Sequence, residues 1–99
     1  MASVADLVEP SVLDRLAGGA ELDAGRALVD RGAVRLVEFG PLRVVADVFD
    51  EGRSGRVSLE SREGTLEWAC TCPGVTAGAC RHVAAAGLET WRKSPRKRT

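Results

Sequence analysis

The chain has 99 residues, of which 44% are hydrophobic and 28% charged, and its formal net charge is zero. This composition is that of one small folded domain and excludes wholesale disorder. No apolar run approaches the roughly eighteen residues of a membrane-spanning helix, and no basic segment followed by a hydrophobic stretch opens the sequence, so we expect a cytoplasmic protein.

The N-terminal part of the chain begins with a weak pattern and then predicts a short helix. Residues 1–8 show no strong preference. From Pro10, the segment PSVLDRLAGG predicts a helix that Ser11 caps, with Asp14 as the acidic partner of a capping box and the glycine pair 18–19 as its end.

A second helix is predicted at about residues 21–31, with Gly32 as its stop. Its apolar stripe consists of Leu22, Ala24, Ala27 and Leu28. We expect Gly25 to let this helix pack closely against a neighbour. The two short helices together make up an N-terminal segment over residues 1–32.

The following segment, residues 33–69, predicts an antiparallel sheet of about four strands. It is rich in β-branched residues, its second half alternates apolar and polar side chains, and Gly40-Pro41 breaks it early. A flexible turn is expected at 50–55 and a hairpin turn at the sequence REG. The predicted strands are 33–38, 42–49, 56–61 and 65–70.

The sequence RHVAAAGLETW predicts a terminal helix from Arg81 to about Trp91, one face of which would pack on the sheet. Gly87 is a poor helix former in this interior position and is expected to mark a close contact. Trp68 is expected to pack against the same helix rather than to stack on a base. Residues 92–99 are predicted to be a basic, disordered tail. The fold class is therefore α+β.

All three cysteines and the single histidine of the chain lie within the thirteen residues CTCPGVTAGACRH, in the spacing Cys70-x-Cys72-x7-Cys80-x-His82. A structural zinc site uses four sulfur or nitrogen donors at tetrahedral corners, and four are present here. The cluster therefore predicts one structural zinc ion.

The residues around the four donors suit that prediction. We expect Pro73-Gly74 to supply a bend after Cys72 that helps Cys70 and Cys72 converge on one ion. Cys80 and His82 would lie in the first turn of the terminal helix, where the helix dipole favours thiolates. Three thiolates and one neutral imidazole around a divalent cation leave the site with a net negative charge, which Arg81 can offset. We expect the C-terminal part to depend on the metal, since structural zinc contributes about 10–16 kcal/mol.

Other chemistries for the cluster are weaker. A disulfide network would leave one of the three cysteines unpaired and would not use the histidine. A Cys–His nucleophile needs one activated thiol and a group that orients the base, whereas three crowded sulfurs have no such division of roles. A redox switch stays open, because zinc thiolates can oxidise.

This C-x-C-x(n)-C-x-H pattern resembles that of the SWIM zinc finger, and the segment GRALVDRGAVRLVEFGPLRVVADV is similar to the one that often precedes the finger in bacterial members. The likeness covers about residues 21–91. It implies that Cys70, Cys72, Cys80 and His82 are the zinc ligands, within a ββα-like SWIM finger over residues 70–91. Since family members usually belong to much larger chains, this sequence is expected to be a stand-alone adaptor or part of a longer protein.

The family resemblance implies binding of DNA or of protein partners, and the charge distribution favours nucleic acid. Residues 51–99 hold nine basic and five acidic side chains, whereas residues 1–50 hold five and nine. Arg and Lys contacts to phosphate give salt-dependent affinity without specifying a base sequence. The candidate nucleic-acid-binding residues are Arg81, Arg92, Lys93, Arg96, Lys97 and Arg98, and Arg53, Arg56 and Arg62 lie on or beside the preceding hairpin. Such a tail is also typical of a solvated chain end.

The alternative function is that of a protein-interaction adaptor, in which the acidic N-terminal half faces a basic partner and the zinc is purely structural. An ordinary solvated helix surface explains the same charges more simply. No enzymatic activity is expected, because four protein ligands close the metal site, whereas catalytic zinc keeps one position open for water.

Overall fold

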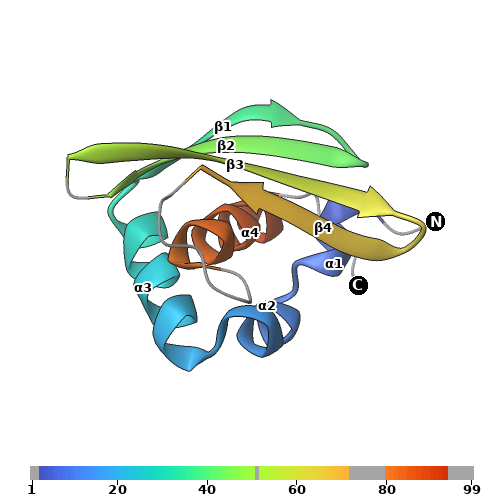
Figure 1. The fold of residues 1–99 in the computed structure, drawn as a ribbon, viewed down its shortest axis with the longest axis horizontal. Coiled ribbons are helices and arrows are strands. Elements are labelled where there is room, and N and C mark those ends of the chain that lie inside the picture. The colour runs from blue at the N-terminus through green and yellow to red at the C-terminus, as the bar shows by residue number, and fades with distance from the viewer. Residues whose placement is uncertain (1–2, 51, 72–79, 94–99) are drawn as a thin grey trace.

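The computed structural model describes residues 3–50, 52–71 and 80–93. Helices and strands form two layers, with the described helices on one face of an antiparallel sheet (Figure 1). The elements in chain order are α1 Val4–Leu7, α2 Pro10–Ala17, α3 Gly19–Asp30, β1 Val34–Phe39, β2 Arg43–Asp50, β3 Arg53–Arg62, β4 Thr65–Cys70 and α4 Arg81–Lys93. The α+β class, the four antiparallel strands and the terminal helix are confirmed.

The strands lie in chain order, β1-β2-β3-β4, and every neighbouring pair is antiparallel. The predicted flexible turn over residues 50–55 is wrong, because β3 already begins at Arg53. Asp50 pairs with Arg53, and Val48 with Gly55, so most of this segment belongs to the β2–β3 ladder. Between the strands, Gly52 lies in a turn and adopts a φ of +82° that few other residues tolerate.

The N-terminal part holds three described helices instead of the predicted two. α1 is stabilised by a capping box, in which the Ser3 hydroxyl accepts from the Asp6 backbone N–H and the Asp6 carboxylate accepts from the Ser3 backbone N–H at 3.0 Å. The predicted cap at Ser11 is wrong, because α2 begins one residue earlier, at Pro10, and its cap residue is Glu9, whose side chain makes no capping hydrogen bond. Proline suits this first helical position because its φ is already helical and its missing N–H is not needed there.

The hydrophobic core lies between the sheet and α4. All eight residues 83–90 of α4 are buried, and they join one cluster with buried residues of the other helices and of the strands. Its members in the sheet are Val44, Ala46, Val48, Val57, Leu59 and Leu66. Trp68 and Trp91 are half-buried against this cluster, which agrees with the expected core role of Trp68.

Two glycines allow α4 to approach its neighbours. A Cβ on Gly25 of α3 would lie 2.8 Å from the backbone N of Ala85, and a Cβ on Gly87 would lie 2.9 Å from a Leu13 methyl carbon. The close packing predicted at both glycines is therefore confirmed. Among the described residues, no helix is long and apolar enough to cross a membrane.

Candidate metal centre

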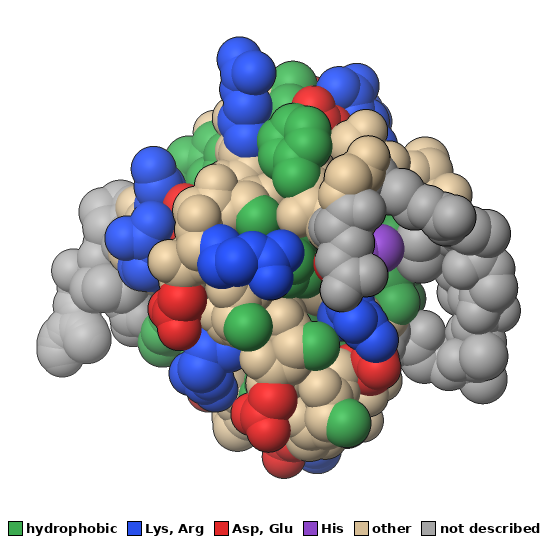
Figure 2. Space-filling view, turned by 90° about the vertical axis from the view of Figure 1, so that its left-hand side faces the viewer, with side chains coloured by type: hydrophobic (Ala, Val, Ile, Leu, Met, Phe, Trp, Pro, Cys, Tyr) green, Lys and Arg blue, Asp and Glu red, His purple; other side chains and the backbone are tan. Residues whose placement is uncertain are grey.

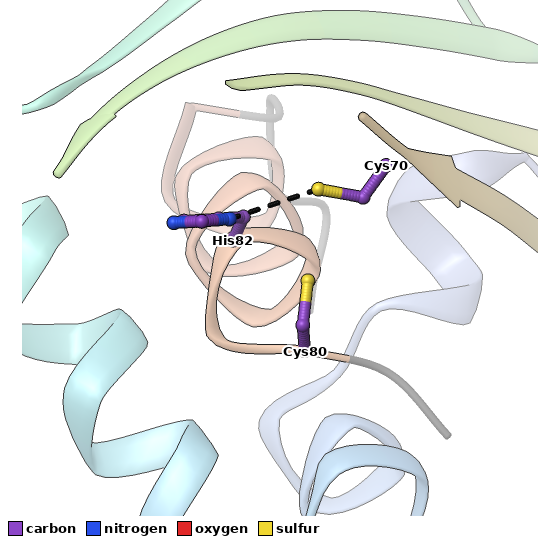
Figure 3. A group of neighbouring side chains, drawn as sticks. All are labelled: Cys70, Cys80 and His82. Carbon is purple, nitrogen blue, oxygen red and sulfur yellow. Dashed lines mark hydrogen bonds between the residues drawn. The ribbon is translucent and has the colours of Figure 1, made fainter. Parts of the chain in front are cut away.

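Three of the four predicted ligands lie together at one end of the sheet (Figure 3). The donor atoms of Cys70, Cys80 and His82 all lie within 4.8 Å of one another, and each of the three residues is half-buried. The fourth predicted ligand, Cys72, lies outside the described residues. The structure thus brings Cys70 together with two donors that follow it by ten and twelve residues in the chain, and these three could hold a metal ion.

Cys70 is placed by the pairing of β4 with β3. It lies opposite Val57 in the ladder, on the same face of the strand as Trp68, and it packs against the core. Two further bonds hold the next residue, because the Thr71 backbone N–H donates to the Arg56 carbonyl at 3.1 Å and the Thr71 hydroxyl accepts from the Arg56 N–H at 2.9 Å. The chain is therefore tied to β3 immediately after the ligand.

Cys80 and His82 are placed by the start of α4. The Cys80 carbonyl accepts the first helical hydrogen bond, from the Ala84 N–H at 3.0 Å, so Cys80 occupies the cap position and His82 the first turn. This confirms the predicted location of the second ligand pair. The positive end of the helix dipole favours thiolates at this position, which is the form in which cysteine binds metal.

One nitrogen of the His82 imidazole lies near the sulfur of Cys70. Its Nδ1 lies 3.7 Å from the Cys70 Sγ, close to the separation of about 3.6 Å that tetrahedral bonds from zinc to one sulfur and one imidazole nitrogen give. The backbone of Gly55 in β3 lies beside this nitrogen, since a Cβ there would be 3.7 Å away. The distance between these two donor atoms therefore fits a zinc ion bound through Nδ1 and the Cys70 sulfur.

The other nitrogen of the ring contacts a residue that sequence reasoning missed. His82 Nε2 lies 3.0 Å from an Oδ2 of Asp50, the last residue of β2, and the two side chains are only 15% and 20% exposed. Asp50 is 32 residues away from His82 in the chain, so no ligand-spacing rule could have found it. Only the strand register, which brings the end of β2 beside the start of β3 and near the end of β4, contains that information.

The basic residues proposed for nucleic-acid binding are engaged with carboxylates wherever the structure describes them. Arg81 lies 3.6 Å from a carboxylate oxygen of Glu21 in α3. Arg92 and Lys93 both pair with Glu89, at 3.1 and 3.8 Å, and the Glu89 side chain is only 7% exposed. Arg96, Lys97 and Arg98 lie outside the described residues. Contacts of Arg81, Arg92 or Lys93 with phosphate would therefore compete with existing ion pairs.

The same holds for Arg56 and Arg62 of the hairpin, whereas the side chain of Arg53 lies outside the part that the structure describes. Arg56 contacts Asp47 at 2.8 Å, and Arg62 contacts Glu60 and Glu67, each at 3.2 Å. The hydrogen bond from Arg56 lowers the pKa of the Asp47 carboxyl below its usual value and raises that of the guanidinium. On the face shown in Figure 2, the described basic and acidic side chains lie interspersed rather than in separate fields.

Comparisons of the chain with protein-family models, with curated proteins and with solved structures found no match in any of the three. The chemistry of the donors is therefore the basis for naming the ion. Two thiols and an imidazole in a half-buried cluster suit zinc, which accepts sulfur and nitrogen at tetrahedral corners and is not redox-active. The site is consistent with that of a small zinc-binding domain.

Proposed function

We propose that the chain is a non-enzymatic zinc-binding module of the SWIM type, in which Cys70, Cys80 and His82 hold one structural zinc together with Cys72. The convergence of three donors from the end of β4 and the start of α4 carries this proposal. The β3–β4 hairpin followed by α4 is also the ββα order that the resemblance implies. Four protein ligands would leave the metal no open position for substrate.

Metal content tests this proposal directly. Native mass spectrometry of the chain purified with zinc should show one zinc ion per chain, and cobalt substitution should give the absorption of a tetrahedral thiolate site. Cys72→Ser should weaken zinc binding strongly, because it removes one ligand of four. A chain that binds no metal under these conditions overturns the proposal. Unchanged affinity in Cys72→Ser would show instead that the fourth position is open.

The module is proposed to bind nucleic acid through its C-terminal tail, and the ion pairs of the described residues sharpen that expectation. Since Arg92 and Lys93 share the carboxylate of Glu89, the phosphate contacts are assigned mainly to Arg96, Lys97 and Arg98. Each contact with duplex DNA steepens the salt dependence, because it releases a counterion. Three contacts correspond to a slope of about −2.7 in the logarithm of affinity against that of salt.

Anisotropy titrations with a short labelled duplex, at about 50 and 200 mM salt, measure that slope. Replacing Arg96, Lys97 and Arg98 by Gln should remove most of it. A matched control replaces three exposed arginines of the sheet, Arg35, Arg43 and Arg62, by Gln, which changes the net charge equally. Equal losses in both variants, or affinity no better than millimolar in the wild type, would count against nucleic-acid binding.

The alternative, a protein-interaction adaptor, is favoured by a different observation. Four large apolar side chains, Val37, Phe39, Leu42 and Phe49, remain about half exposed, between 47% and 50%. All four belong to β1, β2 or the turn between them. The acidic N-terminal half could face a basic partner in this case. Co-purification of a defined partner that is lost in Phe39→Ser and Phe49→Ser, at unchanged zinc content and without DNA affinity, would decide for the adaptor.

A further inference from the structure

The contact between Asp50 and His82 joins the turn end of β2 to a proposed zinc ligand. One oxygen of the Asp50 carboxylate lies 3.0 Å from Nε2, on the side of the ring away from the Cys70 sulfur, which lies 3.7 Å from Nδ1. Figure 3 shows this orientation, with one ring nitrogen toward Cys70 and the other away from it. Asp50 therefore contacts the other ring nitrogen from the one that lies near the Cys70 sulfur.

The chemistry of the pair follows from what each group can donate. A neutral imidazole has one N–H and one lone pair, and an ionised carboxylate only accepts. A hydrogen bond between Asp50 and Nε2 therefore requires the proton on Nε2, which leaves the lone pair of Nδ1 facing the Cys70 sulfur. A carboxylate bound to the second ring nitrogen is a common way to fix the tautomer and the orientation of a metal-bound histidine.

The position of Asp50 is set by the sheet. Val48 and Asp50 lie on the helix-facing side of β2, as Gly55 does on β3 and Cys70 on β4. Gly55 pairs with Val48, and Val57, two residues further along β3, pairs with Cys70. One end of the sheet therefore places the Asp50 carboxylate, the Gly55 backbone and the Cys70 thiol around the ring of His82. The short side chain of aspartate is long enough at this last position of β2, because its carboxylate lies 3.0 Å from Nε2 of His82.

We infer that Asp50 is a positioning residue of the zinc site, which accepts the Nε2–H of His82 and thereby commits Nδ1 to the metal. This inference rests on the proposed zinc binding. Asp50 is not a ligand itself, because its carboxylate meets the ring on the side opposite to the cluster, and the clustered donors are Cys70, Cys80 and His82.

The experiment measures zinc affinity of the full chain by competition with a chelator. Asp50→Ala should bind zinc about 10–100-fold more weakly than the wild type, as is typical when such a partner is lost. Asp50→Asn keeps an accepting oxygen and should recover part of the loss. Asp47→Asn is the matched control, since Asp47 lies on the same strand, is 25% exposed and pairs with Arg56, and it should change the affinity less than twofold.

A second readout identifies the nitrogen that binds the metal. In the zinc-loaded wild type, nitrogen and carbon NMR of the ring should show a protonated Nε2 and a metal-bound Nδ1, with slow exchange of the Nε2 proton. Zinc on Nε2 would overturn the inference even if no Asp50 variant folds. Wild-type affinity in Asp50→Ala would overturn it too, while the zinc site itself stood. A wild-type chain that binds no zinc in the competition experiment would instead refute the proposed function.

Discussion

At the residue scale, Gly25 controls how closely α3 approaches the helix that carries His82. A Cβ at this position would meet backbone atoms, the N of Ala85 at 2.8 Å and the O of Arg81 at 3.0 Å. Backbone atoms cannot rotate away, so the start of α4 would have to move. At Gly87 the nearest atoms belong to the Leu13 side chain, which can adjust.

Gly25→Ala is expected to lower the free energy of unfolding by about 1–3 kcal/mol, because overpacking displaces α4. It should also weaken zinc binding, since Arg81 directly precedes His82. Gly87→Ala should cost less. Urea denaturation of the zinc-saturated proteins measures the first effect and chelator competition the second. Gly19→Ala is the control, because its Cβ would meet its nearest atom at 3.9 Å, and equal stability of the two α3 variants would contradict the prediction.

The clustering of Cys70, Cys80 and His82 could be predicted from sequence because all three lie within thirteen residues in a spacing typical of metal sites. The carboxylate partner of His82 could not, since Asp50 reaches it only through the strand register. The helix caps show the same limit. A serine followed three residues later by aspartate occurs at Ser3 and at Ser11, and only the first is a cap, because Pro10 already starts α2.

At the scale of elements, β2 and β3 are joined across the helix-free face of the sheet by Asp47 and Arg56. The carboxylate accepts from Nε at 2.8 Å and from a second guanidinium nitrogen at 3.2 Å, which is a bidentate pair. Because the bond favours the ionised carboxylate, the pKa of Asp47 is lower in the folded than in the unfolded chain. Its contribution to stability is therefore present above the unfolded value and is lost as the pH falls through the folded one.

The predicted consequence is a pH-dependent difference between the wild type and Asp47→Asn. The variant should be slightly less stable at pH 7, and the difference should narrow as the pH falls below about 4, where the unfolded carboxyl protonates. Urea midpoints measured from neutral to acidic pH test this. Loss of zinc in acid affects both proteins alike and cancels in the comparison. A difference that widened toward low pH would contradict the assigned pair.

The strands could be predicted because alternation and turns are local, whereas the extension of β3 back to Arg53 depends on its partner strand. The environment of α4 was harder to foresee. Its sequence predicted one buried face, but residues 83–90 are buried all round. Because alanine and glycine are small, the sheet and the three N-terminal helices can all approach α4 closely. This helix therefore does not need the polar face that a surface helix usually has.

At the scale of the whole molecule, α4 connects everything else. It contacts all four strands and the three N-terminal helices, and its apolar residues belong to the same core cluster. Its alanines 84–86 are fully buried in that cluster. A metal that ties the start of α4 to the end of β4 should therefore stabilise the entire domain.

We accordingly predict one cooperative thermal transition that shifts as a whole when zinc is removed. At free zinc about 1,000 times the dissociation constant, binding adds about 4 kcal/mol, which for a domain of this size raises Tm by roughly 15–30 °C. Circular dichroism and tryptophan fluorescence should report the same midpoint with and without chelator. Melting of α4 separately from the sheet, or an unchanged Tm, would refute this prediction.

The border of the sheet formed by β1 has a feature that bears on solubility. β1 forms one border, and the irregularity between Leu36 and Glu38 interrupts its pairing with β2. Such an interruption twists a strand and breaks the regular row of amide groups along its outer rim. A neighbouring polypeptide therefore finds no straight template there for adding a further strand, and this local defect disfavours fibrous self-association along that border.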